Sequence, residues 1–120
     1  MRLRLHFLVF CLWGALAACG VTSLLDTKPF YPNETPEIRR LIAHYANFYE
    51  LPVDLVQRVV IRESSHRPKA RNGPYYGLMQ ILPATAKSMG YKGSAEGLLD
   101  AETNLKFAGK YLKGAYLVAN

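Results

Sequence analysis

The stretch that decides the fold is residues 51–86, LPVDLVQRVVIRESSHRPKARNGPYYGLMQILPATA. Its first part predicts a helix over about residues 52–64, because apolar residues recur there at the spacing of one helical face. Prolines and glycines indicate a loop over residues 66–76, a short helix over residues 83–89, and then a second loop through Gly97. The apolar positions of the first helix are Leu55, Val56, Val59 and Val60.

Helical patterns flank this stretch on both sides. Thr35 and Pro36 form a helix cap followed by a first-turn proline, which predicts a helix over residues 36–50. Asp100 can cap a last helix that runs to about Val118. No stretch alternates as a strand does, so the predicted fold is mainly α. The expected buried positions are Ile38, Leu41, Ile42, Tyr45 and Phe48 in the earlier helix, and Ala101, Leu105, Ala108, Tyr111, Leu112 and Ala115 in the later one.

The N-terminal residues have the pattern of an export signal. Arg2 and Arg4 precede an uncharged apolar run over residues 7–15, which is short for a permanent membrane helix. Leu-Ala-Ala-Cys at residues 16–19 resembles the lipobox of bacterial lipoproteins, and this resemblance implies cleavage before Cys19 and lipidation of its thiol. An uncleaved anchor or an ordinary secretory signal are the alternatives, and each keeps the domain outside the cytoplasm.

The expected organisation is a signal peptide over residues 1–18, a lipid-anchored tether over residues 19–35 and one domain over residues 36–120. An aspartate after the lipidated cysteine would favour the inner membrane; Gly20 stands there, so we expect a periplasm-facing domain at the outer membrane. Because Cys11 leaves with the signal peptide, the mature domain has no thiol for a disulfide or a zinc site. We expect no metal and no cofactor.

The charge of the chain favours an anionic partner. Fifteen basic and nine acidic residues give a net charge of +6 at pH 7, and the excess stays positive without the two arginines of the signal. Such an excess suits cell-wall polymer or anionic lipid. No nucleic-acid motif accompanies the charge, and export argues against nucleic acid. The sequence leaves the oligomeric state open.

Glu63 is the candidate catalytic residue. It follows Val59 by four residues and Val60 by three, so it continues the apolar face of its helix. A carboxylate that faces a core or cleft loses hydration, which raises its pKa and keeps a proton for general-acid catalysis at a glycosidic oxygen. The alternative is a solvated glutamate at a frayed helix end.

His66 lacks metal-spaced partners and is expected to be a solvated loop histidine.

The motifs that follow Glu63 resemble a known family. Glu63-Ser64, Gly-Leu-Met-Gln at residues 77–80, Pro-Ala-Thr-Ala at residues 83–86, an asparagine and a Tyr-Leu pair occur in the order of the soluble-lytic-transglycosylase domain, family 1. The resemblance covers about residues 52–112, and Gly-Pro-Tyr-Tyr-Gly is similar to the version in rhizobial and related alphaproteobacterial members. It implies a goose-lysozyme-like α fold that cleaves peptidoglycan glycan strands.

The resemblance also implies the site residues, with Glu63 as the acid and base. Each of the other expected site residues could have a structural role instead of binding substrate. The serine could cap the helix, the glycine could form a turn, the methionine could pack in the core, and the polar side chains could form hydrogen bonds inside the core. Tyr75 and Tyr76 could stack on sugar rings or simply lie on the surface. The expected substrate-binding residues are Ser64, Asn72, Tyr76, Gly77, Met79, Gln80, Asn104 and Tyr111.

The motifs contain no second carboxylate beside Glu63, which indicates a mechanism with one carboxylate. Most glycosidases use two carboxylates, but Asp54 lies nine residues before Glu63 on one helix, about 13 Å away by helix rise. The 2-acetamido group of N-acetylmuramic acid can supply the second group, which gives a 1,6-anhydro end without water. Hydrolysis at Glu63, as in lysozyme, and a non-catalytic wall-binding lipoprotein are the alternatives. Carboxylates outside the motifs are Glu96, Asp100 and Glu102.

The sequence departs from the family in two places. Asn72 stands nine residues after Glu63, where members often have serine; its amide can still donate a hydrogen bond to an acetamido group. Family domains continue through further helices beyond the position of Asn120, so either this sequence is a fragment or the protein has a truncated lysozyme-like domain. We expect marginal stability of the domain alone.

Overall fold

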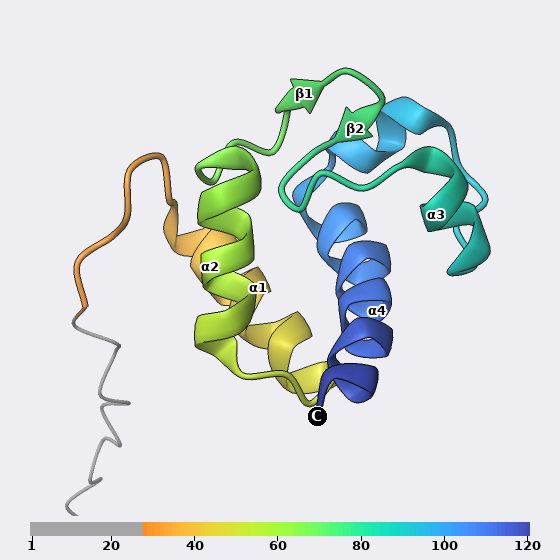
Figure 1. Cartoon of the computed structure of the whole chain (residues 1–120). Helices are drawn as coiled ribbons and strands as arrows, with labels where there is room; N and C mark the ends of the chain where they lie inside the picture. Colours follow the sequence, from red (N-terminus) through yellow and green to blue (C-terminus); the bar gives the residue numbers. More distant parts are fainter. Residues whose placement is uncertain (1–27) are drawn as a thin grey trace, which may run out of the picture.

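The structure is a computed structural model that describes residues 28–120, and this part of the chain is mainly helical (Figure 1). No helix of the described part is long and apolar enough to cross a membrane. The expected signal peptide, Cys19 and most of the expected tether lie outside the described residues. The elements are α1 (Pro36–Phe48), α2 (Val53–Ser64), β1 (Arg71–Asn72), β2 (Tyr75–Tyr76), α3 (Pro83–Ser88), the 3-10 helix η1 (Ala95–Leu99) and α4 (Ala101–Ala119).

Three helices form the body of the domain. α1 packs against both α2 and α4, and the hairpin of β1 and β2 lies at the end of the body away from the C-terminus (Figure 1). α3 and η1 pack against α4, and η1 also contacts β2. The core between them is apolar, and its largest fully buried side chains include Ile42, Val60, Leu78, Leu98 and Leu105.

The helix starts follow from the capping residues. The Thr35 hydroxyl accepts the Ile38 N–H at 3.1 Å, and the Asp100 carboxylate accepts the Thr103 N–H at 2.9 Å. Both predicted starts are therefore confirmed. α2 ends where Ser65 adopts a left-handed conformation (φ 50°) and donates its N–H to Ile61.

The predicted apolar stripe of α1 is correct for four of its five positions. Phe48 is wrong, because its side chain is 68% exposed. At 100° per residue, a step of three from Tyr45 leaves Phe48 at the edge of the face, whereas a step of four brings Tyr49 back toward α4. The Tyr49 hydroxyl accordingly donates to the Lys106 carbonyl at 2.6 Å.

Two regions predicted as loops contain short elements. The antiparallel pair of β1 and β2 aligns Arg71 with Tyr76 and Asn72 with Tyr75, and Tyr76 also bridges to Ile81. Strands of two residues are too short to show alternation, so the sequence pattern missed them. η1 begins where the Ser94 hydroxyl accepts the Gly97 N–H at 3.3 Å.

The end of the expected tether is part of the folded unit. Glu34 is buried and forms a salt bridge of 2.8 Å with Arg39 of α1. The Gln57 amide of α2 also donates to Glu34, at 2.8 Å. The folded unit therefore begins before the boundary expected at residue 36.

The prediction of a solvated His66 is wrong. Its side chain is 1% exposed, stacks on Tyr31 with ring centroids 5.7 Å apart, and lies 3.1 Å from the Gln57 amide nitrogen. His66 follows Ser65 in a left-handed conformation (φ 59°), and this reversal of the chain turns the ring inward beneath residues 31–34.

Candidate active site

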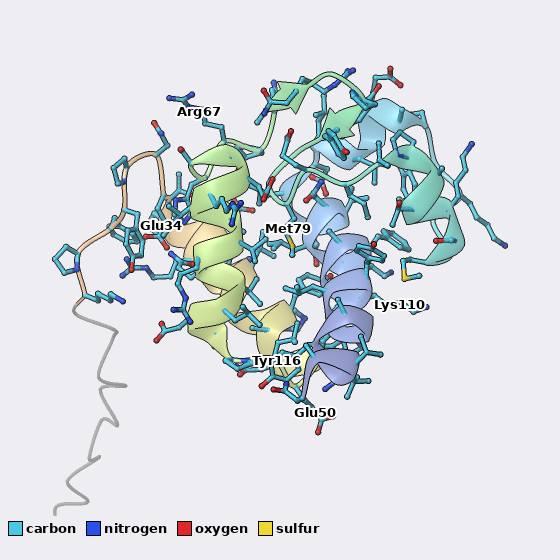
Figure 2. All side chains as sticks on the ribbon, viewed as in Figure 1. Glu34, Glu50, Arg67, Met79, Lys110 and Tyr116 are labelled. Atoms are coloured by element: carbon cyan, nitrogen blue, oxygen red, sulfur yellow. The ribbon has the colours of Figure 1, made fainter. Side chains whose placement is uncertain are left out.

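The candidate site is a cavity of about 360 Å³ between α2, the segment that follows β2, and α4. We call it the Glu63 cavity, because Glu63 is the only carboxylate among the described residues that line it. Met79, one of its lining residues, lies between α2 and α4 (Figure 2). The aliphatic residues of the lining are Val59, Ile81, Leu82, Ala108, Leu112 and Ala115.

Glu63 reaches the cavity from the last turn of α2. It shares a helical face with Val59, which also lines the cavity, so Glu63 continues the apolar face of α2. The side chain is 39% exposed, and Oε1 lies 4.0 Å from the Arg62 guanidinium. The carboxylate therefore has one side against an apolar wall and the other open to substrate and solvent.

The other carboxylates that the sequence left open lie elsewhere. Asp54 is exposed at the start of α2, and Glu102 accepts the Tyr45 hydroxyl at 3.0 Å. Glu96 and Asp100 line a different pocket. Within residues 28–120, no second carboxylate therefore faces Glu63 across the cavity.

Met79 and Gln80 both line the cavity, as expected. Gln80 also has the structural role proposed as the alternative, since its amide donates to the carbonyls of Ala70 (3.1 Å) and Gly77 (2.9 Å). Its carbonyl oxygen accepts the Asn72 amide at 3.1 Å. Asn72 itself is exposed and does not line the cavity; it is linked to the cavity only through this hydrogen bond to Gln80.

Asn104 lies behind the cavity wall and not in it. It is fully buried, and its side chain accepts the Met79 N–H at 2.8 Å and donates to the Tyr76 and Leu98 carbonyls at 2.8 and 2.9 Å. Gly77 has a positive φ of 78°, and a Cβ there would collide with the Asn104 amide and the Leu98 carbonyl. Glycine is therefore required at position 77 because the backbone there lies close to Asn104.

The tyrosines divide between the cavity and the core. Tyr111 is 55% exposed and Tyr75 is 43% exposed, and both line the cavity. Tyr76 is 9% exposed, lies 3.6 Å beneath the Arg71 guanidinium and is not part of the lining. Tyr75 was not among the expected substrate-binding residues, but it lines the cavity and Tyr76 does not. The reason is that neighbouring strand residues point to opposite faces.

Ser64 and Thr85 both differ from the expected set of substrate-binding residues. Ser64 is buried and donates to the Val60 carbonyl at 3.1 Å, so its hydroxyl is used within α2. Thr85 of α3 lines the cavity and was missed, although the Pro-Ala-Thr-Ala motif contained it. No group of three or more His, Cys, Asp or Glu side chains that could hold a metal occurs within residues 28–120.

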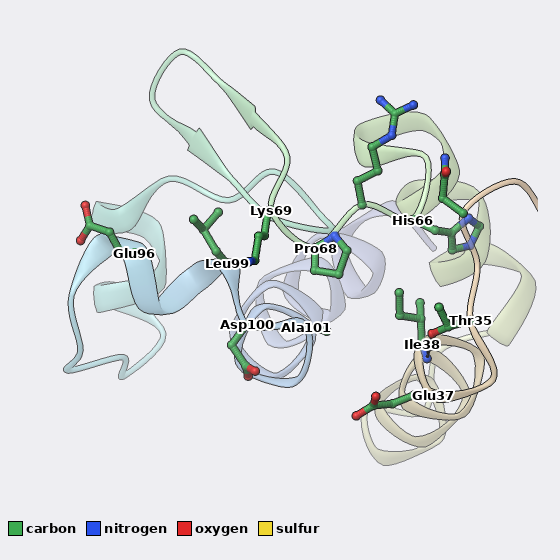
Figure 3. Close-up of a pocket in the computed structure, with 12 residues that line it drawn as sticks. Thr35, Glu37, Ile38, His66, Pro68, Lys69, Glu96, Leu99, Asp100 and Ala101 are labelled. Atoms are coloured by element: carbon green, nitrogen blue, oxygen red, sulfur yellow. Dashed lines mark hydrogen bonds between the residues drawn. The ribbon is translucent and has the colours of Figure 1, made fainter.

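A second, wider pocket of about 860 Å³ lies between the start of α1, residues 66–69 and the start of α4 (Figure 3). Its carboxylates belong to Glu37, Glu96 and Asp100, all on exposed residues. Asp100 is the cap of α4, and none of the three lies in the motifs around Glu63. This pocket therefore lacks a half-buried acid, so the Glu63 cavity is the better candidate for the site.

A buried polar network lies beside the wider pocket. Burial by itself raises the pKa of Glu34, but the hydrogen bonds it accepts and the charge of Arg39 outweigh burial and lower the pKa to about 2. Burial lowers the pKa of His66, and the Glu34 carboxylate only partly offsets this. Because Glu34 fixes the Gln57 amide as a donor, the neutral His66 ring accepts at Nε2.

A helical domain with one carboxylate against an apolar cavity wall is the arrangement of lysozyme-like domains that cleave glycan strands. The family model described as Transglycosylase SLT domain matches residues 40–120, more than half of the chain. The chain therefore belongs to this family, whose domains are lytic transglycosylases that act on peptidoglycan in the cell envelope. We found no significant match to a curated protein or to a solved structure.

Proposed function

We propose that this protein cleaves the β-1,4 bond between N-acetylmuramic acid and N-acetylglucosamine in peptidoglycan, leaves 1,6-anhydro ends and serves cell-wall remodelling. The observation that carries the proposal is the single carboxylate of the Glu63 cavity. With no second carboxylate among the described residues of the lining, the substrate must supply the group that stabilises the anomeric carbon.

Glu63 acts twice in the proposed reaction. It first gives a proton to the glycosidic oxygen, while the carbonyl oxygen of the muramoyl 2-acetamido group attacks C1 from the opposite face and the bond to N-acetylglucosamine breaks. The resulting carboxylate then removes the proton of the muramoyl C6 hydroxyl. The C6 oxygen bonds to C1, the acetamido group is restored, and Glu63 regains its proton.

The other cavity residues position the glycan. Met79 and the aliphatic wall contact the apolar faces of the sugar rings, and the exposed rings of Tyr75 and Tyr111 offer stacking surfaces at the rim. Gln80, tied to the hairpin through its amide, keeps the wall beside Glu63 rigid. Ser64, Asn72, Gly77 and Asn104 act through these residues and do not touch substrate in this proposal.

The proposal extends to the location of the domain. We infer that Cys19 carries a lipid that holds the domain at the outer membrane, facing the periplasm. The support is the lipobox-like sequence of residues 16–19 and the peptidoglycan substrate of the family. Metabolic labelling with a fatty acid tests this inference: Cys19→Ser should lose the label, and label retained by that variant would contradict it.

Digestion of purified sacculi tests the proposed function. Glu63→Gln keeps the size of the side chain but removes its acid, so release of muropeptides should fall by about a thousandfold, within the range of general-acid effects. Glu96→Gln is the matched control, because Glu96 is exposed at the wider pocket. It should digest sacculi as the unchanged protein does. Full digestion of sacculi by a folded Glu63→Gln variant would refute the proposal.

A further inference from the structure

The residues that precede α1 are docked on the body of the domain, and we call residues 28–34 the connector. The Arg39 guanidinium of α1 donates to the Pro29 carbonyl at 2.8 Å and lies 4.2 Å from the centre of the Phe30 ring. The buried Glu34 carboxylate accepts hydrogen bonds from α1 and from α2. The connector is therefore fixed at both of its ends to the helices that it crosses.

The connector also contacts the turn that follows Glu63, and its ribbon passes beside His66 (Figure 3). The Asn33 amide donates to the Ser65 carbonyl at 3.1 Å. The Tyr31 ring stacks on the His66 ring, with centroids 5.7 Å apart and planes 15° from parallel. We call these two contacts the clamp. They reach the chain two and three residues after Glu63.

The turn that the clamp contacts has an unfavourable backbone. Ser65 and His66 are consecutive, neither is glycine, and both have a positive φ, of 50° and 59°. Residues with a Cβ are disfavoured in this conformation, and it persists only where the surroundings hold it. Within the described chain, the Gln57 amide lies 3.1 Å from the His66 ring, and the clamp supplies the contacts from the connector. The connector is thus part of what keeps this turn in place.

Glu63 depends on this turn because it lies in the last turn of α2, which ends at Ser64. The last carbonyls of a helix have no partner within the helix, so helix ends fray unless the residues that follow are fixed. A glutamate on a fraying turn would leave the apolar wall of the Glu63 cavity for solvent. Fixing the turn therefore fixes the point from which the Glu63 carboxylate reaches the cavity.

We propose that Asn33 and Tyr31 of the connector are positioning residues, which clamp the turn after α2 and thereby hold the Glu63 carboxylate in place for proton transfer. Neither residue lines the Glu63 cavity, so each acts through Ser65 or His66 and not on the substrate. The inference rests on the proposed function, because it adds positioning residues to the same reaction. Opening the clamp slows the chemical step and leaves the wall that binds the glycan in place.

Two changes at Asn33 test its hydrogen bond. Asp keeps the size of the side chain but cannot donate, Gly removes the side chain, and both tolerate the positive φ of 62° at this position. Each should lower the rate of muropeptide release at saturating sacculi about fivefold, the size expected for loss of one hydrogen bond. The half-saturating amount of sacculi should change less than about twofold, because binding is kept.

A matched control and a conservative variant separate positioning from loss of fold. Asn47→Asp makes the same change of charge at an exposed residue of α1 and should leave both values unchanged. Tyr31→Leu removes the stacked ring and should slow the saturated rate about fivefold, whereas Tyr31→Phe keeps the ring and should retain the full rate. Melting temperatures measured alongside ensure that each rate refers to folded protein.

Hydrogen exchange measures the clamp without catalysis. Asn33→Asp should speed exchange of the amides of residues 62–66 about fivefold and leave those of α4 unchanged. Equal exchange in the changed and unchanged chains would overturn the clamp, whatever the activity. Full rates of digestion by Asn33→Asp and Tyr31→Leu would overturn the positioning role and leave the proposed function standing. Failure of the unchanged protein to digest sacculi would instead refute the proposed function, and the positioning role with it.

Discussion

Glu63 shows how far single residues could be predicted. Its helical spacing from Val59 placed it on an apolar face, and the structure has both residues in the wall of one cavity. The same reasoning failed for His66, because a left-handed turn after α2, which spacing does not reveal, carries the ring into the interior. Tyr75 was weighed but not selected, since the choice between two neighbouring tyrosines depends on the orientation of a two-residue strand.

Gly77 provides a prediction at the scale of one residue. Gly77→Ala places a Cβ against the Asn104 amide and the Leu98 carbonyl at a positive φ, so we expect a loss of about 2–4 kcal/mol in the free energy of unfolding. Gly114→Ala is the control: it lies in α4 with open space around its Cβ position, and should gain about 0.5–1 kcal/mol from helix propensity. Urea unfolding measures both. Equal effects of the two changes would contradict the role given to the contact with Asn104.

At the scale of elements, local signals predicted the long helices but not the short connections. Thr35, Pro36 and Asp100 mark the helix starts through chemistry that acts within three residues, and the sequence displays it directly. The hairpin of β1 and β2 instead depends on bonds from Gln80 to the Ala70 carbonyl and from Asn104 to the Tyr76 carbonyl. Such bonds join residues 10 and 28 positions apart. They become visible only in three dimensions.

The junction of residues 31–34 with α1 and α2 gives a prediction of pH dependence. The folded state lowers the pKa of His66, so the unfolded chain binds that proton more tightly and stability falls as the pH drops below about 6.5. The pKa of Glu34 is lowered from 4.5 to about 2, so a further loss of about 3 kcal/mol should follow as the pH falls through that range.

Thermal unfolding between pH 8 and about pH 2 measures both steps of this prediction. His66→Gln should remove the step below about pH 6.5 and keep the later loss due to Glu34. His44 is exposed on α1, so His44→Gln is the matched control and should leave both steps in place. A melting temperature that stays constant from pH 7 to pH 5 in the unchanged protein would contradict the buried, neutral state of His66.

At the scale of the whole molecule, the sequence predicted the class of protein but not the shape of its site. The ordered motifs indicated a lysozyme-like helical domain, and the mainly helical fold and the family match confirm it. The cavity, however, joins Val59 of α2 to Ala115 of α4, and the packing of α1 against both helices holds these two walls in place.

In the proposed reaction the muramoyl C6 hydroxyl closes onto C1 with Glu63 as the base, and no water takes part. The most direct measurement is mass spectrometry of muropeptides released by the full chain in water enriched in oxygen-18. We expect products one water lighter than hydrolysis products, with no oxygen-18 at the new sugar end. Products of hydrolytic mass that carry oxygen-18 at the new reducing end would contradict it and assign the cavity to a hydrolase.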